Sequence, residues 1–225
     1  MEKFLVATMA IIMIVTISAA GQNSRTRVVF FGDSITELGV RENGYVTRIA
    51  GLAKAAGKDD KYEFIGAGVS GNKIYDLYLR AETDVIARSP NIVVIFVGVN
   101  DVWHKRLLGT GTDLDKFGKF YSALVTRLQN AKAKVVVCTP AVIGERKNFT
   151  NEMDGELNLY SEWIKKFAAE NHLPLVDLRK VFVEYEEKNN ADDKPSGILT
   201  TDKVHLNPKG NEVVADAIWK VVSGM

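Results

Sequence analysis

Short β-branched runs alternate with longer amphipathic stretches from Arg27 to the end of the chain. This alternation is typical of strand-helix-strand units, which place a parallel sheet between helices. The expected strands are residues 28–31, 62–65, 92–97, 135–139 and 175–176. The expected helices are residues 44–56, 74–87, 114–131, 152–171 and 208–222. The pattern therefore predicts an α/β fold with a five-stranded parallel sheet.

The composition is that of an ordinary globular chain. Of its 225 residues, 46% are hydrophobic and 25% are charged, which is enough apolar material for one full core. The formal net charge is +1, whereas domains that bind nucleic-acid phosphates are usually strongly basic, so we expect no nucleic-acid partner. The single cysteine, Cys138, excludes an internal disulfide and a Cys-rich zinc site. It lies in an apolar run, where we expect it to be buried.

The beginning of the chain has the features of an export signal. Lys3 precedes the apolar run from Phe4 to Ile17, and small residues follow at Ser18 to Ala20. The run is shorter than the ~20 residues that a membrane-spanning helix needs, which favours cleavage near Ala20. Retention of this segment as an uncleaved anchor is the alternative.

This interpretation divides the chain in two. Residues 1–20 are expected to be a signal peptide and residues 21–225 a single domain, because no linker or repeat interrupts them. We then expect export to the periplasm or secretion, with no stable membrane insertion after cleavage. The sequence carries no indication of oligomeric state.

Ligands of open parallel sheets bind outside the carboxyl ends of the strands, so the residues that follow each strand are the first candidates for chemistry. Gly32-Asp33-Ser34 follows the first expected strand. A glycine-rich segment, Gly66 to Asn72, ends the second, and Gly98-Val99-Asn100-Asp101 follows the third. Asp202-Lys203-Val204-His205 precedes the last helix.

These residue types suit nucleophilic catalysis. A serine directly after a strand exposes its hydroxyl and keeps a free backbone N–H, as Ser34 would. Asp202 and His205 are three residues apart, so a carboxylate can bind one imidazole nitrogen while the other faces the serine. Gly71 and Asn100 offer a backbone N–H and a side-chain amide for an oxyanion. Each motif alone is also compatible with a turn or a helix cap.

Together the motifs resemble those of the SGNH or GDSL-type hydrolases. Phe31-Gly32-Asp33-Ser34-Ile35-Thr36 resembles the first block of that family, and Gly71 in Val69-Ser70-Gly71-Asn72 resembles the second. Gly98-Val99-Asn100-Asp101 and Asp202-Lys203-Val204-His205 resemble the third and the last. All four occur in order. One departure is Lys203, which stands where many relatives have glycine.

The resemblance implies a flavodoxin-like three-layer α/β/α sandwich and ester hydrolysis through an acyl-enzyme, without metal or cofactor. It implies that Ser34 is the nucleophile, His205 the base, and Asp202 the residue that orients the base. The backbone N–H groups of Ser34 and Gly71 and the side chain of Asn100 would form the oxyanion hole. Loss of one such donor typically costs about 2.7 to 4 kcal/mol of transition-state stabilisation.

The sequence constrains the substrate less than it constrains the reaction. Trp103 and His104 follow the third block, where they can line a pocket, and Asp33 is a third candidate substrate-binding residue. Short connections without a hydrophobic lid favour a small acyl group on a soluble alcohol, such as an acetylated sugar. The alternatives are a lysophospholipase or thioesterase acting on lipids, and a non-catalytic glycan-binding relative.

Two further interpretations are weaker. Residues 66–71 match G-x-G-x-x-G, the dinucleotide-binding fingerprint. That fingerprint belongs after the first strand, with an acidic residue ~20 positions later, whereas here it follows the second strand and position 91 is Asn91. A metal site is also unsupported, because His104, His172 and His205 show no paired spacing.

Overall fold

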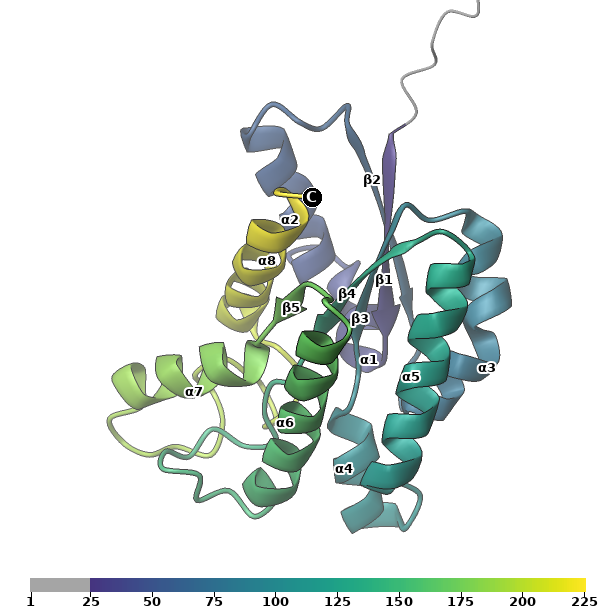
Figure 1. The fold of residues 1–225 in the computed structure, drawn as a ribbon. Helices are drawn as coiled ribbons and strands as arrows, with labels where there is room; N and C mark the ends of the chain where they lie inside the picture. The colour runs from purple at the N-terminus through teal and green to yellow at the C-terminus, as the bar shows by residue number, and fades with distance from the viewer. Residues whose placement is uncertain (1–24) are drawn as a thin grey trace, which may run out of the picture.

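A computed structural model describes residues 25–225 of the chain, so the signal-peptide prediction for residues 1–20 lies outside the described residues. Five strands form one sheet in the order β2-β1-β3-β4-β5, and every pairing is parallel (Figure 1). The strands are β1 (Thr26–Gly32), β2 (Tyr62–Gly68), β3 (Ile92–Phe96), β4 (Lys134–Cys138) and β5 (Leu175–Val176). This strand order is that of flavodoxin-like folds, and the predicted fold class is confirmed.

Helices cover both faces of the sheet and make three layers (Figure 1). On one face α2 (Tyr45–Ala55) packs against α8 (Pro208–Val222). On the other face α3 (Ile74–Asp84) packs against α5 (Leu114–Asn130), and α6 (Asp154–Glu170) lies beside α5. Asn207 caps α8 by accepting hydrogen bonds from Lys209 and Gly210, as the Asn-Pro sequence favours.

Three further helices begin directly after strands, and the hydrophobic pattern did not predict them. They are α1 (Ser34–Gly39) after β1, α4 (Val99–Leu108) after β3 and α7 (Leu178–Asn189) after β5, and a 3₁₀ turn spans Ile86–Arg88. The first is too short for a recognisable apolar period. Only the first turn of α4 is buried, and the buried face of α7 includes Arg179 and Glu186. Polar residues on a buried face hide the periodicity on which the prediction depends.

The core lies on both sides of the central strands. All four side chains from Val28 to Phe31 are fully buried, as are nearly all of those in β3 and β4. Continuous burial is expected for parallel strands covered on both faces. Cys138, at the end of β4, is fully buried, as predicted. Burial also raises the pKa of its thiol, which makes it a poor nucleophile.

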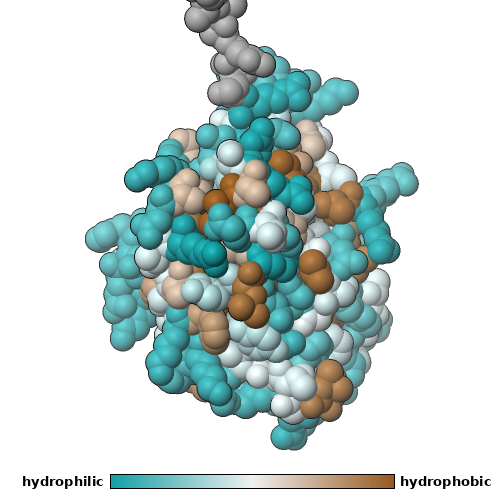
Figure 2. Space-filling view, turned by 90° about the vertical axis from the view of Figure 1, so that its right-hand side faces the viewer, coloured by the Kyte–Doolittle hydropathy of each residue, from teal (hydrophilic) through white to brown (hydrophobic). Residues whose placement is uncertain are grey.

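The surface on the side of α3 and α5 is mostly hydrophilic, with small separate hydrophobic spots (Figure 2). Across residues 25–225, every helix is too short or too polar to cross a bilayer.

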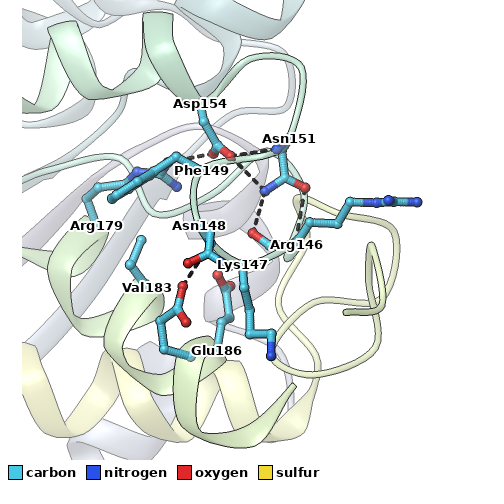
Figure 3. A pocket seen from close by; sticks show the side chains of 10 residues that line it. Arg146, Lys147, Asn148, Phe149, Asn151, Asp154, Arg179, Val183 and Glu186 are labelled. Atoms are coloured by element: carbon cyan, nitrogen blue, oxygen red, sulfur yellow. Dashed lines mark hydrogen bonds and ion pairs between the residues drawn. The ribbon is translucent and has the colours of Figure 1, made fainter. Parts of the chain in front are cut away.

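A polar cluster is buried between the loop that follows β4 and helix α7 (Figure 3). Arg179 pairs with Asp154 at 2.6 Å between a guanidinium nitrogen and a carboxylate oxygen. Beside this ion pair is a pocket of about 10 Å³, lined in part by Glu186, which is 3% exposed. One carboxyl oxygen of Glu186 has no hydrogen-bond partner among the described residues. Burial, together with the charge of Glu145, raises the pKa of Glu186 to about 8.

This shift predicts a pH-dependent stability. Because the pKa of Glu186 is raised above its ordinary value of 4.5, the folded state holds a proton that the unfolded state releases over this range. Stability therefore falls as pH rises from about 4.5 towards 8. We expect Glu186→Gln, which mimics the protonated side chain, to raise Tm relative to the wild type by several degrees at pH 9 and by less at pH 5. Thermal denaturation at both pH values measures this; an equal effect at both would contradict the assignment.

Candidate active site

The sheet register brings the first candidate residues to one edge. Gly32, the last residue of β1, pairs with Gly68 of β2 and with Phe96 of β3. A Cβ at Gly32 would lie 2.3 Å from the Phe96 carbonyl oxygen and 2.3 Å from the Thr36 hydroxyl. Only glycine therefore lets the chain pass from β1 into α1 this close to β3.

Ser34 is the first residue of α1. The preceding residue, Asp33, caps the helix, because its carboxylate accepts a hydrogen bond from the Ile35 N–H at 3.0 Å. An N–H in the first turn of a helix has no acceptor within that helix, so the Ser34 amide is free to bind an anion. Ser34 as a whole is 8% exposed, and the hydrogen bond between its hydroxyl and His205 is partly buried.

The loop before α8 brings an imidazole and a carboxylate to this serine. His205 Nε2 lies 2.9 Å from Ser34 Oγ, and His205 Nδ1 lies 2.7 Å from one carboxylate oxygen of Asp202. The other Asp202 oxygen accepts the backbone N–H groups of Val204 and His205 at 3.1 and 2.8 Å. The structure thus brings the three predicted residues, Ser34, His205 and Asp202, into one continuous hydrogen-bonded line.

The charge of Asp202 is stabilised in this turn. Partial burial acts to raise its pKa, but hydrogen bonds from the His205 ring and from the His205 and Val204 backbones outweigh it and lower the pKa. Asp202 is therefore ionised at neutral pH. A carboxylate at Nδ1 favours the tautomer in which Nε2 is free to accept a proton.

Two further hydrogen-bond donors follow β2 and β3. Gly71 has φ +76°, a conformation that glycine adopts without strain, and no described residue accepts a hydrogen bond from its N–H. The Asn100 side chain, 2% exposed, donates one N–H to the Asn72 carbonyl at 3.1 Å and keeps a second. These donors and the Ser34 amide are the predicted oxyanion hole.

Residues that the sequence prediction did not include hold these donors in place. The Asp101 carboxylate accepts the Ile74 N–H at 3.2 Å and so joins the starts of α4 and α3. Burial raises its pKa to about 7. Arg80 donates to the carbonyls of Gly32 and Ala67 and to the side chain of Asn72. Asp101 belongs to a recognised motif, but nothing in the sequence marks Arg80.

Of the three predicted substrate-binding residues, Asp33 is engaged in a helix cap, whereas Trp103 and His104 lie next to His205 and Gly71. Burial raises the pKa of Asp33 to about 6, and its carboxylate is occupied by the cap of α1. Trp103 packs edge to face with His205, at 6.5 Å between ring centroids. His104 lies against Gly71, since a Cβ there would be 3.7 Å from His104 Cε1. Burial, with the charge of Lys73, lowers the pKa of His104.

Glu145, which the sequence did not single out, anchors the loop that carries Asp202 and His205. Its carboxylate is fully buried and accepts three consecutive backbone N–H groups, those of Ile198, Leu199 and Thr200, at 2.8, 2.5 and 2.7 Å. A charged acceptor with three amide donors is a strong arrangement in a buried site. Glu145 therefore fixes the backbone two residues before Asp202.

Comparison with known proteins gives a family and relatives of known activity. The model of the GDSL-like Lipase/Acylhydrolase family matches residues 30–213. The acetylxylan esterase of Geobacillus stearothermophilus is 28% identical over 214 residues, which cover 88% of this chain and 94% of that protein. The isoamyl acetate-hydrolyzing esterase of Saccharomyces cerevisiae is 24% identical over 217 residues, covering 87% of this chain and 85% of that protein.

Solved structures of acetyl xylan esterases are also similar to this chain. One is the crystal structure of the acetyl xylan esterase AlAXEase, which superposes on this chain with a TM-score of 0.85 and 57% sequence identity. The superposition covers 87% of this chain and 99% of that chain. The Geobacillus enzyme has been solved as two catalytic mutants, in which a serine or a histidine is replaced by alanine. Each has a TM-score of 0.77 at 27% identity and covers 88% of this chain and 94% of that chain.

The anchoring contacts of Glu145 generate a prediction. Glu145→Gln removes the charge and places an amide N–H₂ against backbone donors, so the loop that carries His205 should shift. We expect kcat on p-nitrophenyl acetate to fall roughly 10- to 100-fold with little change in KM, because misplacement of about 1 Å can cost 10²-fold. Glu186→Gln is the matched control, since Glu186 makes no hydrogen bond to this loop. A lower Tm with unchanged kcat would show that Glu145 is only structural.

Proposed function

This chain belongs to the GDSL-like Lipase/Acylhydrolase family and is a carboxylic ester hydrolase, and we propose that it removes acetyl groups from acetylated carbohydrate through an acyl-enzyme on Ser34. The observation that carries the proposed mechanism is the continuous hydrogen-bonded line from Ser34 through His205 to Asp202.

In the first half-reaction Ser34 Oγ attacks the ester carbonyl carbon while its proton moves to His205 Nε2. The resulting imidazolium is stabilised by the ionised Asp202 at 2.7 Å. The carbonyl oxygen becomes an oxyanion, and the Ser34 and Gly71 amides and the Asn100 side chain would donate hydrogen bonds to it. Collapse of this intermediate breaks the ester C–O bond, and the imidazolium gives its proton to the departing sugar hydroxyl.

In the second half-reaction a water molecule takes the place of the alcohol. His205 accepts a proton from the water, and the resulting hydroxide attacks the acyl carbon. The bond to Ser34 Oγ breaks, the serine regains its proton from the imidazolium, and acetate leaves. The nucleophile, the base and the oxyanion donors that this reaction needs all belong to this chain.

The choice of acyl group and alcohol rests on the relatives and on the shape of the site. The 57% identical structure is an acetyl xylan esterase, and the curated relatives from Geobacillus and Saccharomyces are named for acetate esters. A cleft of about 560 Å³ opens beside Asp202 of the proposed triad, and Trp103, which packs against His205, is also in its lining. Its size is that of ordinary ligand sites, and an aromatic wall suits a sugar ring.

We also propose that the protein acts outside the cytoplasm, as one domain from residue 21 onward. The support is the basic, apolar and small-residue pattern of residues 1–20. N-terminal sequencing of protein recovered from the periplasm or medium tests this. A mature chain that begins near Gly21 supports export, and recovery only from the cytoplasm contradicts it.

The proposed reaction predicts four results that one set of ester assays can test. The wild type should release acetate from acetylated xylan and should hydrolyse p-nitrophenyl acetate faster than a long-chain p-nitrophenyl ester. Ser34→Ala should abolish both activities, and Asn100→Ala should lower kcat by roughly 10² to 10³-fold. Circular dichroism of each variant controls for folding. Preference for the long-chain ester would replace the carbohydrate proposal with the lipid esterase alternative.

A further inference from the structure

The cleft beside the triad has a distinctive chemistry. It lies between the loop that follows β4 and the loop that carries Asp202, two segments joined by a hydrogen bond from the Gly144 N–H to the Lys203 carbonyl at 2.8 Å. Its lining includes three large apolar side chains, Trp103, Leu107 and Met153. Because Asp202, Lys203 and Val204 belong to its lining, a group bound in this cleft lies beside the turn that precedes His205.

The two basic side chains in the lining are free of acidic partners. Among the described residues, neither Lys203 nor Arg146 forms an ion pair, and both are exposed. The two acidic side chains in the lining are both occupied, because Glu152 pairs with Arg106 and Asp202 binds His205. Figure 3 shows the Arg146 guanidinium extending away from the buried cluster of Asp154 and Glu186. The cleft thus presents two cations without an ion-pair partner in the described part of the chain, Lys203 and Arg146, next to the Asp202 carboxylate, which is hydrogen-bonded to His205.

The backbone conformation of Lys203 also indicates that this cation has a role in the cleft. Its φ is +84°, a conformation that disfavours any residue with a Cβ. The turn imposes this conformation, since the N–H groups of Val204 and His205 both bind the carboxylate of Asp202. Glycine would adopt it without strain. Strained residues cluster at functional sites, and here the strain places an ammonium group beside the catalytic turn.

We propose that this cleft is a subsite for a carboxylate carried by the glycan, so that the enzyme prefers acetyl groups near an acidic sugar branch. This inference rests on the proposed function and names its substrate class. Trp103, Leu107 and Met153 supply apolar surface for a sugar ring, and Lys203 and Arg146 bind the carboxylate. The guanidinium can bind it with two parallel hydrogen bonds, and the ammonium acts as a point charge.

The test compares kcat/KM on acetylated xylo-oligosaccharides with and without a uronic acid branch. The wild type should prefer the acidic substrate, and Lys203→Gly and Arg146→Gln should each lower this preference by roughly three- to tenfold, as expected for one partly exposed ion pair. The preference should also weaken at high salt. Lys132→Gly is the matched control, because Lys132 is exposed, has φ +68° and lies at the end of α5, outside the cleft lining.

The outcomes separate this inference from the proposed function. An unchanged preference in both variants, with the neutral oligosaccharide still deacetylated, overturns the acidic subsite and leaves the acetyl esterase intact. An equal loss of preference in Lys132→Gly also overturns it, since the effect would then come from the backbone. If the wild type deacetylates neither oligosaccharide, the proposed function fails, and the subsite fails with it.

Discussion

The hydrogen bond between His205 Nε2 and Ser34 Oγ, 2.9 Å long, joins residues 171 positions apart in the chain. The proposed chemistry depends on this contact, because a serine hydroxyl is a weak nucleophile until a base takes its proton. The sheet places Ser34 at the carboxyl end of β1, beside the ends of β2 and β3, and α8 returns along the same sheet. The fold thus brings the proposed base, His205, to the proposed nucleophile, Ser34, at the sheet edge where Gly71 and Asn100 follow β2 and β3.

The loop that carries the base is held by polar contacts rather than by hydrophobic packing alone. Glu145 accepts three of its backbone N–H groups, and Asp202 accepts two more within the turn. A buried acceptor such as Glu145 tolerates little displacement, because a lost partner leaves an unsatisfied polar group. The strained backbone of Lys203 lies between these two sets of contacts. A functional site needs its side chains held by rigid surroundings, and these contacts hold the loop of Asp202 and His205 next to an exposed cleft.

The sequence predicted the parts of the structure that depend on local pattern. The five strands and their parallel arrangement followed from short apolar runs, and the four motifs located the strand ends that meet at the site. Helices α1, α4 and α7 were missed. Helix α1 is very short, α4 buries only its first turn, and the buried face of α7 mixes apolar and charged side chains. Arg80 and Glu145 were also missed, because their roles come from partners 8 to 55 residues away. Such partners become visible only when the chain is folded.

Covalent labelling tests the central claim most directly. The full chain is treated with an alkyl fluorophosphonate, which reacts with activated serine hydroxyls, and the adduct is located by peptide mass spectrometry. The account predicts one adduct per chain, on Ser34, formed at a rate that falls sharply in His205→Ala. Labelling at another residue, or labelling of Ser34 that His205→Ala leaves unchanged, would contradict the claim that His205 activates Ser34.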